Sequence, residues 1–133
     1  MVVEKIYETK LTMKNLLRLE ELLQFALAIY LFNQLPYAGW LYLAWFLAPD
    51  ISMIGYLANP KVGAWTYNLI HHKGIAVAVY LIGAYIGNPA LMFAGTLLLG
   101  HSAFDRVAGY GLKYEDSFHH TNLGWIGKAK PTQ

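Results

Sequence analysis

Four long apolar stretches occupy most of this 133-residue chain and constrain its fold more than any other feature of the sequence. They cover about residues 16–35, 37–57, 67–86 and 90–107. Because a helix needs about 20 mostly apolar residues to cross the hydrocarbon core of a bilayer, each stretch predicts a membrane span. The connections are short, which favours antiparallel neighbours. We therefore predict one all-α domain over residues 1–133, an integral-membrane, up-down-up-down four-helix bundle with a polar tail at 108–133.

The composition agrees with a membrane protein and excludes several other classes. Hydrophobic residues make up 56% of the chain and charged residues 14%, against about 45–50% and 25% in average soluble domains. The net charge of +2 is too small for a nucleic-acid-binding surface. The chain has no cysteine, so disulfides, thiol nucleophiles and iron–sulfur clusters are excluded. Membrane lipids are the expected partners, nucleic acid is not, and a homo-oligomer remains open.

Basic residues predict the orientation of the bundle. The connections at 33–36 and 87–89 carry no charge, whereas lysines and arginines precede the first span, flank the middle loop and follow the last span. Cytoplasmic loops carry an excess of Lys and Arg. Both termini and the middle loop are therefore predicted to be cytoplasmic, in a multi-pass protein of the inner (plasma) membrane.

Acidic residues and histidines converge on the cytoplasmic side of this predicted bundle. A charged residue at the centre of a membrane helix costs about 2.5–3.5 kcal/mol, so such residues usually face the protein interior and have a partner. Imidazole and carboxylate together suit zinc, iron or manganese. We therefore predict a divalent-metal site with these ligands: Glu20, Asp50, His71, His101 and Asp105.

Local spacing supports two parts of this set. His101 and Asp105 are four residues apart, which places both side chains on one face of a helix. Pro49 lacks a backbone donor and disfavours helix, which would open the chain beside Asp50. The choice of Glu20 over Glu21 is less constrained, because adjacent helical residues point about 100° apart. We choose Glu20 because it shares a face with Gln24.

Several residues near the predicted site suit an anionic group. Arg106 and Lys113 would supply the charge, and Asn68 and Tyr110 would line the same substrate site. Anchoring of the 109–114 segment to lipid headgroups is the alternative interpretation. His119 and His120 lie in the tail beside Asp116, and their role is left open.

Five motifs resemble a known family: Arg18-Leu19-Glu20, the segment from Ala48 to Met53, the segment from Tyr67 to His71, the segment from His101 to Arg106, and the segment from Gly109 to Tyr114. They resemble a bacterial family of small four-helix membrane proteins catalogued as domain of unknown function 4260, over about residues 14–127. The resemblance implies the same fold and polar core, and it implies no activity. The family pattern resembles Thr-His-Leu-Gly near its end, where this chain has Thr121-Asn122-Leu123-Gly124.

A second, weaker resemblance is to membrane-bound metal-dependent hydrolases, through Pro49-Asp50, His71 and His101. Together with the polar residues it leads us to predict a metal-dependent enzyme, a hydrolase acting on a lipid or another amphiphile at the cytoplasmic leaflet. Asp105 and Glu20 are the predicted catalytic residues. The alternative is a non-enzymatic bundle whose hydrogen-bonded polar core binds a small molecule or only specifies packing.

Overall fold

A computed structural model describes residues 1–127 of the chain. Its helices are α1 (Val2–Asn33), α2 (Gly39–Trp45), the 3₁₀ helix η1 (Ala48–Leu57), α3 (Pro60–His71), α4 (Lys73–Ile86) and α5 (Pro89–Ala108). A two-stranded antiparallel hairpin follows, formed by β1 (His120–Thr121) and β2 (Gly124–Trp125). The predicted all-α class is therefore confirmed.

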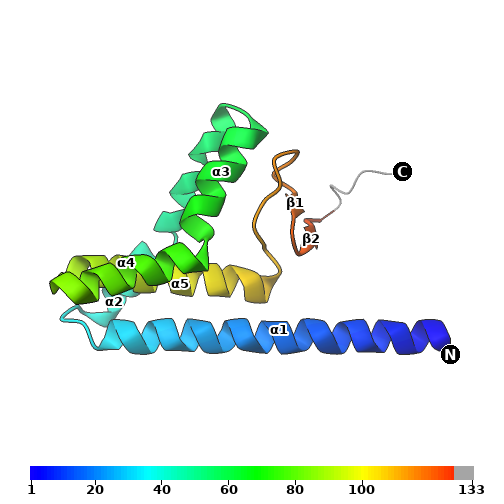
Figure 1. Cartoon of the computed structure of the whole chain (residues 1–133), viewed down its shortest axis with the longest axis horizontal. Helices are drawn as coiled ribbons and strands as arrows, with labels where there is room; N and C mark the ends of the chain where they lie inside the picture. Colours follow the sequence, from blue (N-terminus) through cyan, green and yellow to red (C-terminus); the bar gives the residue numbers. More distant parts are fainter. Residues whose placement is uncertain (128–133) are drawn as a thin grey trace.

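The helices form a layer and an arm (Figure 1). In the layer, α5 packs against both α1 and α4, and α1 continues past the other helices toward the N-terminus. The arm consists of η1 and α3, which pack on each other and project away from the layer. The C-terminal segment returns from the end of α5 to lie beside α3. The described residues thus do not form the predicted row of four antiparallel spans.

Small residues allow α4 and α5 to approach closely. A Cβ atom added at Gly95 would lie 2.6 Å from the backbone nitrogen of Tyr80, and one at Gly83 would lie 2.7 Å from that of Met92. Glycines at such contacts let two helix backbones meet. An apolar core of Phe32, Leu35, Tyr42 and Leu97 fills the end of the layer where α1, α2 and α5 converge.

Two of the predicted spans are broken. Residues 37–57 divide into α2 and η1, with Pro49 in the first turn of η1. Residues 67–86 divide at His72, whose extended backbone ends α3 and whose side chain accepts a hydrogen bond from Ile75 N at the start of α4. The two helices meet at a bend of 47°. The break beside Asp50 was predicted from Pro49. The break at His72 was not predicted, because His72 serves as a helix cap and a histidine is a weak sequence signal for that role.

The ends of the chain differ from the prediction as well. The first helix begins at Val2 rather than near residue 16, whereas α5 matches the predicted 90–107 closely. The predicted polar tail packs on the protein, since Lys113 and Thr121 are 5% and 2% exposed. Its last residues, 128–133, lie outside the described part of the chain.

Within residues 1–127, the stretch Gly39–Leu57 is long and apolar enough to cross a membrane, and the bent pair α3–α4 would be a second candidate if it forms one span. The structure thus supports one or two candidate spans, and four separate spans are not supported. Charged residues at positions 18, 20 and 21 near the middle of α1 and the polar end of α5 distinguish these helices from candidate spans.

Candidate metal centre

Four of the five predicted metal ligands meet at the junction of the arm and the layer. Asp50 lies in the first turn of η1, His71 ends α3, and His101 and Asp105 occupy successive turns of α5. One ligand atom from each residue lies within 4.8 Å of the others. The imidazole side chains are buried, whereas the Asp50 side chain is 33% exposed and that of Asp105 is 16% exposed.

Each imidazole faces both carboxylates. The Nε2 atom of His71 lies 3.3 Å from Asp50 Oδ1 and 3.6 Å from Asp105 Oδ2. The Nε2 atom of His101 lies 3.1 Å and 3.4 Å from the same two oxygens. The four atoms therefore surround one small central volume with nearly equal nitrogen–oxygen separations.

The outer nitrogens of both imidazoles are held by backbone carbonyl groups. His71 Nδ1 donates to the carbonyl oxygen of Tyr67 at 2.9 Å, and His101 Nδ1 donates to that of Phe46 at 2.7 Å. Since a carbonyl oxygen only accepts, each Nδ1 carries a proton, and in the neutral imidazole Nε2 presents its lone pair inward. Two lone pairs and two carboxylate oxygens then face one another. This arrangement calls for a cation or for additional protons at its centre.

Aromatic side chains fix the ligands from outside. The Tyr67 hydroxyl donates to Asp105 Oδ2 at 3.3 Å, and the Tyr67 ring stacks on the His71 imidazole with centroids 3.7 Å apart. The Phe46 ring lies 5.3 Å from that of His101. Hydrogen bonds of this kind set the orientation and tautomer of metal-binding histidines. The contacts of Tyr67 and Phe46 with the ligands were not predicted from the sequence. The position of Tyr67, four residues before His71 on the same helix face, was the signal for one of them.

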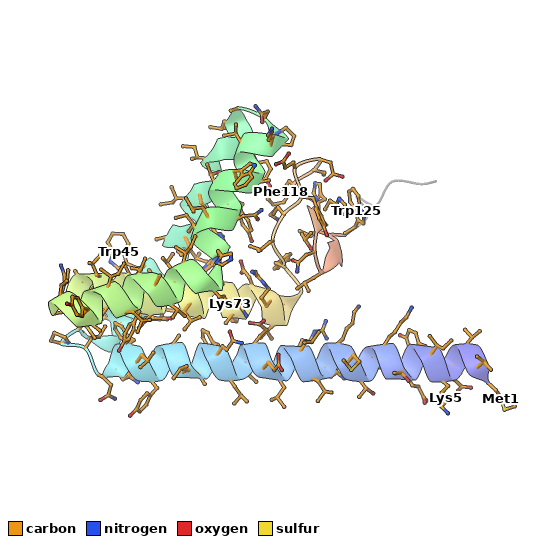
Figure 2. All side chains as sticks on the ribbon, in the orientation of Figure 1. Met1, Lys5, Trp45, Lys73, Phe118 and Trp125 are labelled. Atoms are coloured by element: carbon orange, nitrogen blue, oxygen red, sulfur yellow. The ribbon has the colours of Figure 1, made fainter. Side chains whose placement is uncertain are left out.

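Glu20, the fifth predicted ligand and second predicted catalytic residue, is not part of this group. It is exposed on α1, and the neighbouring Glu21 turns inward instead. Both carboxylate oxygens of Glu21 accept hydrogen bonds from Lys73 at 2.6 Å, and Gln24 accepts a third at 3.0 Å. Figure 2 shows Lys73 above α1, at the start of α4. The choice of Glu20 was wrong because Gln24 shares a helix face with Glu21 as well.

The predicted anion-binding residues have different surroundings. The Asn68 side chain donates to the Lys113 carbonyl oxygen and accepts from the Lys113 N–H, both at 2.7 Å. Asn68 thus anchors the C-terminal segment to α3. The Tyr110 side chain is 44% exposed. Arg106 is buried at the end of α5.

Lys113 is a buried cation between two aromatic rings. Its Nζ lies 3.8 Å from the centroid of Phe118 and 4.7 Å from that of Tyr67, and Figure 2 shows Phe118 between the C-terminal segment and α3. Burial lowers the pKa of Lys113 from its usual 10.5 to about 8, and the charges of Asp105 and Asp50 partly oppose this. The Lys113 ammonium group therefore lies over Tyr67, whose hydroxyl donates to Asp105 in the candidate metal centre.

His120 belongs to the hairpin. Its Nδ1 lies 2.9 Å from the carboxylate oxygens of Asp116, and its ring stacks on Trp125 with centroids 4.2 Å apart. Trp125 is visible at the hairpin in Figure 2. These contacts hold the C-terminal segment together, and neither His119 nor His120 joins the four-residue centre.

The fold and the site define an all-α protein with a buried centre of two histidines and two aspartates. The family model described as "Domain of unknown function (DUF4260)" matches residues 14–126, and the chain belongs to this family. No curated protein and no solved structure matches the chain.

Proposed function

We propose that this protein binds one divalent metal ion through Asp50, His71, His101 and Asp105 and uses it for hydrolysis. The observation that carries the proposal is the set of four inward-facing acceptors left by the two Nδ1–carbonyl hydrogen bonds. A divalent cation balances the two carboxylate charges and accepts both imidazole lone pairs. Without a cation or additional protons at the centre, the like charges of the carboxylates and the imidazole lone pairs would oppose one another.

The four nitrogen–oxygen separations between ligand atoms fit tetrahedral zinc. Zinc bonds of about 2.0–2.1 Å in a tetrahedron place neighbouring ligand atoms about 3.3–3.4 Å apart. The four nitrogen–oxygen separations are 3.1, 3.3, 3.4 and 3.6 Å, which bracket this value. In an octahedral site with bonds of about 2.1 Å, neighbouring ligands would be only about 3.0 Å apart.

A membrane surface is the proposed environment. Large apolar side chains are exposed along α1, α2, η1 and α4, including Leu23, Leu43, Leu57 and Tyr85 at 62%, 79%, 85% and 92%. Exposed apolar surface on this scale marks contact with lipid or with another protein. The distribution of basic residues supports a position of the centre at the cytoplasmic leaflet of the inner membrane, where the substrate would be a lipid or another amphiphile.

The two aspartates are suited to different tasks. Asp105 accepts from Tyr67 and is the more buried, so it is placed to remain a ligand. Asp50 has a side chain that is 33% exposed, so it borders the side from which substrate arrives and is placed to receive a proton from water. A bound zinc ion would polarise a carbonyl or phosphoryl oxygen and lower the pKa of water.

Turnover of defined substrates tests this proposal. Zinc-loaded protein in detergent is incubated with short-chain phospholipids and with aryl esters and aryl phosphates, and the products are measured by mass spectrometry. We expect hydrolysis that is lost in Asp50→Asn and retained in Glu20→Gln, a matched carboxylate-to-amide change outside the centre. Equal hydrolysis in both variants, or none by folded and metal-loaded protein, would contradict the proposed reaction.

A structural metal site is the second candidate function. Four protein ligands already complete a tetrahedron, and structural zinc sites are usually closed in this way, whereas catalytic sites keep an open position. In that case metal removal should unfold the junction of the arm and the layer. The zinc-loaded protein would then hydrolyse none of the substrates, although it would still bind zinc.

A further inference from the structure

A polar cavity lies where α1, the end of α5 and the turn of the C-terminal hairpin meet. Its volume is about 220 Å³. Three basic side chains and one acidic side chain line it: Lys14, Arg18, Arg106 and Glu21. The cavity is separate from the metal centre, although Arg106 follows the ligand Asp105 directly in α5.

The charge of this cavity is strongly positive. Both oxygens of Glu21 are bound by Lys73 at 2.6 Å, so this carboxylate is already neutralised. Within residues 1–127, no carboxylate lies within ion-pair distance of Lys14, Arg18 or Arg106. Three positive charges thus surround the cavity without an acidic partner in the described part of the chain.

Arg106 is a buried cation whose hydrogen-bond partners in the described part of the chain are uncharged. It is only 9% exposed, and its two hydrogen bonds within residues 1–127 go to the carbonyl oxygens of His71 at 3.3 Å and Tyr110 at 3.4 Å. Both are long, and neither partner carries a charge. A buried cation without a charged partner is strongly unfavourable. A planar guanidinium is well matched to the oxygens of a phosphate.

We propose that this cavity binds a phosphate group, held by Arg106 from inside and by Arg18 and Lys14 from α1. The group belongs to a lipid headgroup or to a free phosphate. The inference deepens the proposed function and rests on it only in identifying this phosphate as part of the substrate. Because Arg106 also holds the His71 carbonyl, a phosphate bound here sits beside the metal centre.

Calorimetric titration of the detergent-purified protein tests the site. The probes are inorganic phosphate and dihexanoyl phosphatidic acid, a short-chain lipid with the same phosphate. The variants are Arg18→Gln and the double variant Lys14→Gln/Arg18→Gln, since the exposed side chains can change without unfolding the protein. Lys10→Gln is the matched control, because Lys10 is an exposed cation of α1 that does not line the cavity.

We expect wild type to bind at least one probe, and Arg18→Gln to bind it about tenfold more weakly, as for loss of one charge-assisted hydrogen bond. The double variant should bind more weakly still, and Lys10→Gln should match wild type. Binding of both probes supports a site for free phosphate, and binding of the lipid alone supports a headgroup site. Failure of both probes to bind, or equal binding by the double variant and wild type, would overturn the proposal.

The metal content of each sample separates this inference from the proposed function. Phosphate binding by protein that takes up no metal would support the anion site and contradict the proposed metal centre. Stoichiometric metal in protein that binds no phosphate would support the metal centre and contradict the anion site.

Discussion

Replacing Lys113 with methionine should change how the stability of the fold depends on pH. The ammonium group of Lys113 is buried over the rings of Phe118 and Tyr67, and burial lowers its pKa from 10.5 to about 8. Methionine keeps a similar length and removes the charge. The backbone hydrogen bonds with Asn68 do not involve the side chain of Lys113, so the C-terminal segment should stay docked.

The sign follows from the two pKa values. Below pH 8 the lysine is protonated in both the folded and the unfolded chain, and the folded state carries the full cost of the buried charge. Between pH 8 and 10.5 the unfolded chain binds more protons, so the free energy of unfolding rises with pH. The pKa difference corresponds to a gain of about 3 kcal/mol at most. Methionine has no proton to lose and gives no such gain.

Urea unfolding of wild type and Lys113→Met in the same detergent, from about pH 7 to about pH 10.5, measures this effect. The other residues are the same in both proteins, so the difference between the two curves isolates the side chain at position 113. We expect wild type to gain stability relative to the variant as pH rises. Parallel curves over the whole range would refute the assignment of Lys113 as a buried cation.

Three further predictions concern metal affinity and the contacts between helices. Tyr67→Phe removes the hydroxyl donor to Asp105 and should weaken metal affinity about tenfold without unfolding the protein, measured by competition with a chelating dye. Glu21→Gln should lower the free energy of unfolding by about 1–2 kcal/mol through loss of its bonds to a partly buried lysine, whereas Glu20→Gln should change it by less than about 0.5 kcal/mol in the same assay. Gly95→Ala places a methyl group 2.6 Å from the α4 backbone and should cost about 1–3 kcal/mol in urea unfolding; a cost near zero would contradict the close packing of the two helices.

Four residues of the candidate metal centre could be predicted from the sequence because their signals are local. His101 and Asp105 share a face by helical spacing, and both enter the centre. Pro49 predicted an opening in the helix beside Asp50, and a 3₁₀ helix begins there. The cost of burying ionisable groups in apolar segments then indicates that such residues meet.

The remaining features depend on contacts between distant segments, which local spacing cannot report. Glu20 and Glu21 differ only by a rotation on α1, and the partner that selects Glu21 is Lys73, which is 52 residues away. The docking of the C-terminal segment likewise depends on Asn68, whose partner is 45 residues away. The break at His72 has no proline or glycine at the position itself, so apolar periodicity alone predicted one continuous helix.

The most direct test of the central claim is the metal content of the detergent-purified protein, measured by plasma mass spectrometry. Wild type, Asp50→Ala, His101→Ala and the control Glu20→Ala are prepared together, with folding checked by circular dichroism. Our account predicts close to one divalent metal ion per chain in wild type and Glu20→Ala, with zinc the expected metal, and its loss in the two ligand variants. Folded wild type without metal after exposure to zinc, iron and manganese, or full metal content in both ligand variants, would contradict it.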